Sequence, residues 1–489
     1  MPPITIYLIL IFSLFIPPHP TTADQSFISS LITQTGLDFV KNLLISKAIP
    51  TLTATRISAI EKTVRIPVIG KVHIVLSDIT INRVNVGLSK IKPDVTGVTI
   101  SGSDVTCDLS LKWHYAYGTW LGPISISDSG TARVKVIGME TGTKLGLHNE
   151  EGSLKLYVIN CNCHMRDMSI DLNGGASWLY QGVVDAFEES IRSEVSKEII
   201  KKLKAGVIKL GSVVESLPKL IEVDDIASLN VTFVNDPFLS DTSLGFGING
   251  LFVESKKDKF LFGNMLPPPV SCSDPSKMVG IALDEAVFNS AFGLYYNAMF
   301  MRWVVDKVPE QNLLNTAGWR FIVPQLYKKY PNDDMNLEIT LSSPPIMRVS
   351  NQNIDATVYA DLVIDVLPGV DTIPVACISL VMTGVGTVEV TRNNLTGHLK
   401  LDDFTMSLKW SKIGTLHMFL IQPVMWTLIE TVFLPYINAR LEIGFLLPIF
   451  RGITLQNAEI LFRDSRITIC SDFSYKEPFD PSRTLVYSS

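Results

Sequence analysis

The stretch VHIVLSDITINRVNVGL, residues 72–88, alternates apolar and polar side chains and is rich in β-branched residues. Such alternation is typical of a strand with one buried face, because successive side chains of a strand point to opposite sides. The same pattern continues in three later segments: GVTISGSDVTCDLSLKW (97–113), ARVKVIGM (132–139) and SLKLYVINCNCHMRDMSIDL (153–172). Residues 64–172 are therefore predicted to form an antiparallel sheet of long strands.

Predicted helices precede and follow this sheet. Residues 25–48 carry apolar side chains at helical spacing, and residues 177–209 repeat them every four positions, as at Phe187, Ile191 and Val195. This spacing places the apolar side chains of each segment on one face of a helix. The first half is therefore predicted to be helix, sheet and long helix, in that order.

The second half repeats this order. A helix is predicted at 284–307, alternating strands at 337–412, and a helical region at 415–445 that is bent or divided at Pro423 and Pro435. The predicted fold class is α+β, with two similar domains in which an antiparallel sheet wraps on helices.

The sequence also predicts a signal peptide, two domains, a linker and a C-terminal tail. Residues 1–23, which contain the apolar run ITIYLILIFSLFI, are predicted to be a signal peptide. The expected domains are 24–253 and 278–472, with a linker at 254–277 that contains three consecutive prolines, and a tail at 473–489. The mature chain is accordingly expected to be secreted.

One later segment is apolar enough to raise the question of a membrane span. LHMFLIQPVMWTLIETVFL, residues 416–434, includes His417, Gln422, Pro423 and Glu430. Each of these is costly in hydrocarbon, so a buried or lipid-touching helix is the better interpretation.

Composition indicates an apolar protein with unevenly distributed charge. Hydrophobic residues make up 46% of the chain and charged residues only 18%. Residues 24–219 hold 22 Lys and Arg against 19 Asp and Glu, whereas the rest of the chain holds 20 against 29. Residues 39–77 carry six basic residues and one acidic residue. This stretch is either an ordinary solvated face or a site for an anionic partner.

The sequence contains no motif of catalysis or of cofactor binding in the context that such a motif requires. GFGING (245–250) fits a dinucleotide fingerprint, but no helix follows to hold a pyrophosphate. The chain has no G-x-S-x-G, H-E-x-x-H or C-x-x-C motif. Cys161 and Cys163 are strand neighbours two positions apart with His164 beside them, and disulfide pairing or burial is favoured over zinc. No enzyme activity, cofactor, metal site or nucleic-acid partner is predicted.

Other residues fit a secretory route. Asn230-Val-Thr and Asn394-Leu-Thr are glycosylation sequons. The six cysteines allow one to three disulfides in an oxidising compartment.

A row of aromatic residues lies near a predicted hairpin end. Trp113, Tyr115 and Tyr117 alternate and would share one face of a strand, and Trp120 follows beyond Gly118. Two interpretations stay open: the rings belong to the core, or they lie exposed at a boundary between lipid and water.

A long helix on a curved sheet can leave a slot between the two. A slot that is lined but not filled by side chains takes an acyl chain, and each buried CH₂ contributes about 0.8 kcal/mol. This interpretation accounts for the apolar excess without any catalytic group.

The sequence resembles the bactericidal/permeability-increasing and lipopolysaccharide-binding protein family, particularly its plant members. The N-terminal half carries the resemblance in GLDFVKNLLISKAIPTL, IPVIGKVHIVLSDITI and ISGSDVTCDLSLKW. The C-terminal half carries it in MVGIALDEAVFNSAFGLYY, LKLDDFTMSLKWSKIG and VFLPYINARLEIGFLLP. The resemblance implies a boomerang of two barrel-and-helix domains joined by a central sheet, with an apolar lipid pocket in each domain.

The resemblance also implies an N-terminal tip that binds the lipid A part of lipopolysaccharide. The family's basic arm falls on residues 50–73, and its second tip hairpin falls on the aromatic row, where family members often carry more Lys and Arg. The residues expected at this tip are Arg56, Lys62, Arg65, Lys71, His73, Lys112, Trp113, Tyr115, Tyr117 and Trp120.

The family's disulfide joins a Cys just before the long helix to one near that helix's end. Cys161 or Cys163 fits the first place, but the predicted helix has no Cys. Cys107 is the expected substitute.

Two functions follow as expectations. The first is a secreted, non-enzymatic protein of innate immune defence that binds lipopolysaccharide at the tip, holds phospholipid acyl chains and touches the bacterial outer membrane peripherally. In a plant such a protein would act in the apoplast or cell wall. The alternative is an extracellular phospholipid or neutral-lipid transfer protein without lipopolysaccharide specificity.

Overall fold

The computed structural model describes residues 26–66, 70–118, 125–173, 180–255, 270–307, 311–450 and 452–476. The predicted signal peptide, Trp120, most of the predicted linker and most of the predicted tail lie outside these residues. The chain divides into two compact units. The N-terminal unit is Ile32–Leu217 with Asp236–Gly245, and the C-terminal unit is the described part of Met1–Leu31, Pro218–Asn235 and Phe246–Ser489.

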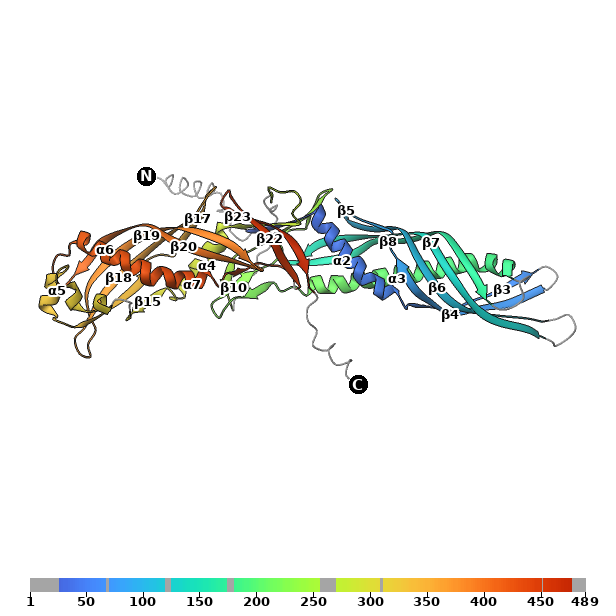
Figure 1. Cartoon of the computed structure of the whole chain (residues 1–489), viewed down its shortest axis with the longest axis horizontal. Coiled ribbons are helices and arrows are strands. Elements are labelled where there is room, and N and C mark those ends of the chain that lie inside the picture. The colour runs from blue at the N-terminus through green and yellow to red at the C-terminus, as the bar shows by residue number, and fades with distance from the viewer. Residues whose placement is uncertain are drawn as a thin grey trace, which may run out of the picture. The chain divides into compact units, whose positions relative to one another are not determined.

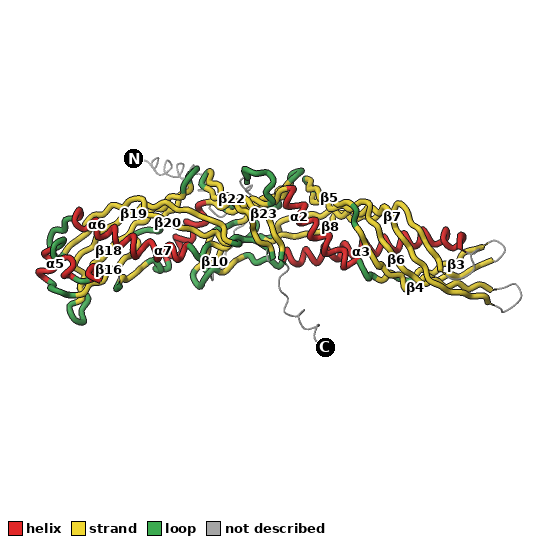
Figure 2. The backbone as a smooth tube through the Cα atoms, in the orientation of Figure 1, coloured by secondary structure: helices red, strands yellow, loops and turns green. Residues whose placement is uncertain are grey.

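Strands dominate the N-terminal unit, as Figure 2 shows in yellow. Its sheet is antiparallel with the order β2-β4-β6-β7-β8, and β3 and β5 pair with β4 and β6. The long helix α3 runs along β8, and the shorter α2 contacts α3 (Figure 1). The elements are α2 (Gln34–Leu52), β2 (Arg56–Ile57), β3 (Ile60–Ile66), β4 (Gly70–Asn85), β5 (Leu88–Asp94), β6 (Gly97–Gly118), β7 (Ser125–Glu150), β8 (Ser153–Asn173), α3 (Tyr180–Glu215) and β11 (Phe238–Leu239).

The C-terminal unit repeats this plan with a second antiparallel sheet. Its order is β15-β16-β18-β19-β20-β21, and β17 pairs with β18. Helices α6 and α7, joined by the π-helical segment η5, follow β20 and pack against it. The elements of this sheet and its helices are α4 (Glu285–Asn297), β15 (Arg302–Val305), η3 (Gln311–Leu314), η4 (Thr316–Trp319), α5 (Pro324–Lys329), β16 (Asp334–Leu341), β17 (Ile346–Val349), β18 (Ile354–Leu367), β19 (Ile373–Thr391), β20 (Asn394–Ser411), α6 (Met418–Leu428), η5 (Ile429–Phe433), α7 (Leu434–Leu441) and β21 (Phe445–Leu446).

Two smaller sheets complete the described structure. A six-stranded sheet has the order β11-β12-β1-β14-β23-β22, and a three-stranded sheet has the order β13-β10-β9. Their remaining strands are β1 (Ile28–Thr33), β9 (Leu220–Glu222), β10 (Ala227–Asn230), β12 (Ser243–Ile248), β13 (Phe252–Glu254), β14 (Val279–Asp284), β22 (Ile453–Arg463) and β23 (Arg466–Tyr475). The predicted fold class, two similar units of curled antiparallel sheet and helices, is confirmed.

Three predicted boundaries were wrong. The helix predicted from residue 25 begins only at Gln34, because Ile28–Thr33 is a strand and Thr33 caps the helix by accepting a hydrogen bond from Gly36 N. The helix predicted at 284–307 ends at Asn297, since Met299 has a φ of 56° and the chain then forms β15. Strand β23 continues to Tyr475, three residues into the predicted tail.

The helical region after β20 runs from Met418 to Leu441 without a break. Pro423 lies inside α6, and the π-helical turn at Ile429–Phe433 precedes Pro435 in the first turn of α7. Among the described residues this is the one stretch that is long and apolar enough to cross a membrane, judged by length and composition. One side of the stretch is buried through Ile421, Met425 and Leu428.

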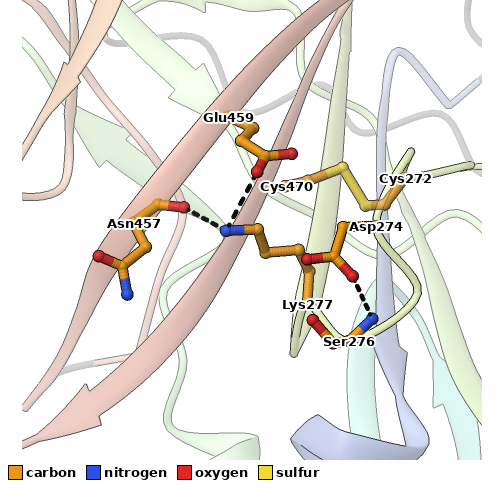
Figure 3. The surroundings of a disulfide bond; sticks show 7 residues. All are labelled: Cys272, Asp274, Ser276, Lys277, Asn457, Glu459 and Cys470. Atoms are coloured by element: carbon orange, nitrogen blue, oxygen red, sulfur yellow. Dashed lines mark hydrogen bonds and ion pairs between the residues drawn. A yellow bond between two sulfur atoms is a disulfide. The ribbon is translucent and has the colours of Figure 1, made fainter.

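The disulfide of the described residues joins Cys272 to Cys470 of β23 in the C-terminal unit (Figure 3). Lys277 lies close to it and is buried. Its Nζ donates a 2.7 Å hydrogen bond to the Asn457 carbonyl and lies 3.5 Å from Glu459. These contacts fix the segment after Cys272 to the β22–β23 hairpin.

The predicted bridge between Cys107 and Cys161 or Cys163 was wrong, because all three are free thiols. They lie on different strands: Cys107 on β6, and Cys161 and Cys163 on β8, with β7 between them. Ser196 of α3 lowers the pKa of the Cys163 thiol, against the larger effect of burial, which raises it.

Candidate functional site

A groove lies between the first half of β8 and the second half of α3 in the N-terminal unit. Its volume is about 400 Å³, within the range of small-molecule sites. Its lining is apolar apart from Asn160, Cys161 and Lys204; the full lining is Leu156, Tyr157, Val158, Ile159, Asn160, Cys161, Lys204, Val207 and Ile208. The combination of an apolar wall and one cation suits an amphiphile with an anionic head group.

The sequence of α3 explains why the groove stays open. In the first half of the helix, Phe187, Ile191, Val195 and Ile199 are buried at four-residue spacing against the sheet. In the second half, Leu203 and Val207 are only half-buried, and Ile208 is 68% exposed. The same helix therefore closes the core along its first half, whereas along its second half Leu203 is the last residue packed against that core and Ile208 is exposed.

Strand β8 contributes an irregularity on the opposite wall. Its register against β7 shifts between Lys144 and Leu145, which pair with Asn160 and Val158, so that Ile159 is an extra residue. Ile159 and Tyr157 are both exposed although apolar. A β-bulge disturbs the regular pleat, and both residues are among those that line the groove.

Helix α2 adds a second half-exposed apolar surface in this unit. Phe39, Val40, Leu43 and Leu44 are all half-buried, although a helix of a filled core would bury such residues. Lys41 is buried, and its ammonium group donates to Asp38 at 2.7 Å and to the Ser89 carbonyl at 3.4 Å. This hydrogen bond is the main cause that lowers the pKa of Asp38.

The predicted tip is formed by two neighbouring hairpins. Strands β3 and β4 pair Arg65 directly with Lys71, and β4 in turn pairs Val72 with Tyr117 of β6. The turns themselves, 67–69 and 119–124, lie outside the described residues. The structure therefore brings the basic hairpin and the aromatic hairpin together, as the resemblance implies.

The basic side chains of the tip do not form one patch. Arg65, Lys71 and His73 are exposed and share the outer face, where the Thr63 hydroxyl lies 3.3 Å from His73 Nδ1. Lys62 occupies a register position of the opposite face, level with Ile74 and Tyr115. Only the first three residues are thus positioned to meet one anion.

Asp78 interacts with two of the predicted tip cations, Lys112 and Arg56. Lys112 Nζ is 2.8 Å from Asp78, and this hydrogen bond lowers the pKa of Asp78 and raises that of Lys112. The charge of Arg56 lowers the pKa of Asp78 further. Asp78 thus offsets part of the positive charge that the sequence places here.

The aromatic row belongs to the core. Trp113 and Tyr115 are 4% and 5% exposed, and the row stacks with centroid separations of 5.9 Å and 6.2 Å from Trp113 through Tyr115 to Tyr117. Trp113 Nε1 donates to the Thr131 carbonyl at 3.2 Å, and its ring lies where a side chain at Gly130 would have to be. Surface contact of Trp113 and Tyr115 with lipid, one of the two open interpretations, is therefore wrong. Tyr117 is half-buried at the end of the row.

The remaining predicted residues have different environments. Asn230 is 6% exposed, and its Oδ1 accepts hydrogen bonds from Thr232 N and Oγ1, so a glycan there does not fit the folded unit. Asn394 is half-exposed and donates to the Ile443 carbonyl at 3.3 Å. Burial raises the pKa of Cys107 to about 12 and that of Cys163 to about 11. Among the described residues, no group of three or more His, Cys, Asp or Glu could hold a metal ion.

Sequence reasoning missed the groove residues Leu156, Val158, Lys204 and Val207. A signal was present: Val207 continues the four-residue series of α3, and Ile208 beside it adds an apolar side chain off that face. Apolar side chains of a helix that do not face the sheet need another partner to shield them from water.

The geometry defines a class of protein: two barrel-and-helix units, one of which holds an open apolar groove beneath its long helix. The chain belongs to the LBP / BPI / CETP family, whose N-terminal domain model matches residues 36–216 and whose C-terminal domain model matches residues 221–475. This is a family of lipid-binding and lipid-transfer proteins.

Several known proteins are similar over most of the chain. A BPI/LBP family protein of Arabidopsis thaliana is 55% identical and covers 96% of each chain. A lipopolysaccharide-binding protein of Bos taurus is 26% identical over 67% of this chain and 69% of its own. A phospholipid transfer protein of Mus musculus is 22% identical over 93% and 90%. The crystal structure of a lipopolysaccharide-binding protein shares the fold, with a TM-score of 0.62, 20% identity, and coverage of 92% of this chain and 99% of that one.

Proposed function

We propose that this protein is a secreted, non-enzymatic lipid-binding protein that captures lipopolysaccharide in innate immune defence or sensing. The groove between β8 and α3 takes an acyl chain, and Lys204 pairs with an anionic group at its margin. The outer face of the β3–β4 hairpin binds the lipid A phosphates. The C-terminal unit holds a second acyl chain along its own long helix.

The pairing of Arg65 with Lys71 is the observation that carries the lipopolysaccharide part of the proposal. Like charges directly opposite in an antiparallel pair destabilise it. A bound phosphate removes this repulsion and gains charge-assisted hydrogen bonds from both groups. His73, exposed on the same face, adds a ring nitrogen that can hydrogen-bond to the same phosphate.

The first prediction concerns this pair. Arg65→Gln combined with Lys71→Gln is expected to weaken lipopolysaccharide binding at least tenfold at low salt, because about 1 kcal/mol is lost for each cation near an anionic lipid surface. Binding by the unchanged protein should weaken as salt is raised, since exposed charges are screened. Affinities for lipopolysaccharide and lipid A, measured by isothermal titration calorimetry at two salt concentrations, check both statements.

The matched control is Arg133→Gln combined with Lys135→Gln, which removes two exposed cations from the outer face of β7. This variant should bind lipopolysaccharide normally. Equal loss in the two double variants would show that net charge, and not the Arg65–Lys71 pair, governs binding.

The second candidate function is extracellular transfer of phospholipids or neutral lipids without lipopolysaccharide specificity. It is favoured by the groove, by the Asp78 that offsets Lys112, and by the similarity to a phospholipid transfer protein. Equal affinity for phosphatidylcholine and lipopolysaccharide, independent of salt, would establish this function instead. Mass spectrometry of lipids extracted from the purified protein identifies the natural occupant.

A further inference from the structure

Aromatic side chains lie exposed at one end of the C-terminal sheet. Phe321, just after η4, is 79% exposed, and Phe419 in the first turn of α6 is 70% exposed. Trp410, near the end of β20, is 37% exposed. Leu408 and Leu420 extend this apolar surface. Exposed aromatic residues that lie close together in space mark an interaction site.

Two segments, 319–330 and 408–420, form this surface, which we call the terminal face. Lys329 Nζ donates to the Lys412 carbonyl at 3.4 Å and joins them directly. Beneath them, Leu326, Ile413 and Ile421 are buried in one core cluster. Helix α5 and the start of α6 accordingly lie at the same end of the unit in Figure 1.

The terminal face is basic in an otherwise acidic half of the chain. Its 25 residues hold Arg320, Lys328, Lys329, Lys409 and Lys412 and no Asp or Glu, whereas residues 220–489 carry nine more acidic than basic residues. Lys409 pairs with Asp361 at 2.7 Å. Within the described part of the chain, the other four cations form no ion pair. Asp334 and Asp371 lie at the same end of the sheet outside the terminal face, so the four cations of the face themselves, and not the net charge of this end, favour an anionic partner.

The cations lie over aromatic rings. The Arg320 guanidinium is 4.5 Å from the centre of the Phe321 ring, and the ammonium groups of Lys412 and Lys329 are 5.4 Å from the rings of Trp410 and Tyr330. A ring that enters the acyl boundary while the adjacent cation stays at the phosphate level is the arrangement of interfacial membrane segments.

We propose that the terminal face docks on the surface of an anionic phospholipid bilayer. Phe321 and Phe419 enter the interface, and Arg320, Lys328, Lys329 and Lys412 contact lipid phosphates. This surface lies in the C-terminal unit and uses none of the residues of the β3–β4 hairpin or of the groove in the N-terminal unit. Its test is therefore independent of the proposed lipopolysaccharide site.

The test is co-sedimentation of the full chain with vesicles of phosphatidylcholine alone and of phosphatidylcholine with 30 mol% phosphatidylglycerol. The unchanged protein should bind the anionic vesicles at least tenfold more tightly than the neutral ones, because cations near an anionic surface add to apolar insertion. Phe321→Ser with Phe419→Ser should lose at least tenfold in affinity for the anionic vesicles. Lys328→Gln, Lys329→Gln and Lys412→Gln together should abolish the preference for the anionic vesicles.

Two controls make the test specific. Leu88→Ser with Val95→Ser removes two exposed apolar side chains from the N-terminal unit, and Arg133→Gln with Lys135→Gln removes two exposed cations from the outer face of β7. Both variants should sediment with anionic vesicles as the unchanged protein does. All substituted side chains are exposed, and circular dichroism verifies that each variant is folded.

Three results would overturn the proposal: no preference of the unchanged protein for anionic vesicles, an unchanged affinity of the Phe321→Ser, Phe419→Ser variant, or an equal loss in either control. A dimer in solution that the Phe321→Ser, Phe419→Ser variant dissociates would likewise overturn it, since a second copy would then cover this face. Light scattering coupled to size-exclusion chromatography measures that outcome.

Discussion

At the residue scale, Trp113 links the aromatic hairpin to the core. Its ring is buried, stacks on Tyr115 and occupies the space beside Gly130. Trp113→Ala should lower the free energy of unfolding by about 3–5 kcal/mol, because it leaves a large cavity. Urea unfolding of the N-terminal unit, followed by circular dichroism of the full chain, checks this value.

His114 provides the comparison, because it is the next residue of the same strand and points outward. His114→Ala should change stability by less than about 0.5 kcal/mol. If Trp113→Ala were equally harmless, the ring would not be part of the core as described.

Asp365 is expected to make the stability of the C-terminal unit depend on pH. It is buried on β18, and desolvation, with a smaller effect of Glu338, raises its pKa. The folded state then binds the proton more tightly than the unfolded state. Stability is therefore lost as pH rises above the ordinary carboxyl value of about 4 and through the folded pKa.

Asp365→Asn should consequently raise the thermal midpoint of the C-terminal unit at pH 7 and leave it unchanged at pH 3. Differential scanning calorimetry at both pH values measures this. The exposed Asp402→Asn should show no such dependence. A lower midpoint for Asp365→Asn at pH 7 would mean that the ionised carboxylate stabilises the fold.

At the element scale, asparagine side chains attach helices to strand edges. Asn438 of α7 is buried, accepts a 2.8 Å hydrogen bond from Leu399 N and donates a 3.0 Å bond to the Leu399 carbonyl. Asn289 of α4 does the same at Met347, with distances of 2.8 Å and 2.9 Å. Each amide thereby replaces one residue of a missing neighbouring strand.

Asn438→Leu should lower the free energy of unfolding of the C-terminal unit by about 3 kcal/mol, because each buried group left without a partner costs about 1–3 kcal/mol. Chemical unfolding monitored by far-ultraviolet circular dichroism measures the change. Ala439→Leu, at the next and exposed position of the same helix, should be nearly neutral. A loss no larger in Asn438→Leu than in Ala439→Leu would show that the two hydrogen bonds between Asn438 and Leu399 do not stabilise the unit.

The sequence predicted some helices and strands correctly and left others undecided. Alternation along β4, β6, β7 and β8 located the strands, and the four-residue period located the core face of α3. It did not locate the end of α4, because the left-handed Met299 is apolar and carries no turn signal. It also left the aromatic row undecided, since periodicity separates two faces without showing which one is covered.

The candidate site was predictable only in part. The basic arm was found by counting charge, but only the register separates Arg65 and Lys71 from Lys62. The groove depends on the bulge at Ile159 and on the widening of the apolar stripe of α3. The disulfide depends on which strands become neighbours, because Cys272 and Cys470 are 198 positions apart.

At the scale of the whole molecule, the account depends on apolar space that the chain leaves for lipid. Val207→Trp places an indole in the groove, whereas Val213→Trp changes the same residue type on an exposed part of the same helix. Filling the groove should exclude an acyl chain without disturbing the buried half of α3.

The most direct measurement is titration of the full chain with a fluorescent long-chain fatty acid. The Val207→Trp variant should lose at least tenfold in affinity at the groove, and Val213→Trp should bind as the unchanged protein does. Since each buried CH₂ contributes about 0.8 kcal/mol, excluding two or three of them is enough for this change. Identical titrations for all three proteins would contradict the central claim that the groove under α3 holds an acyl chain.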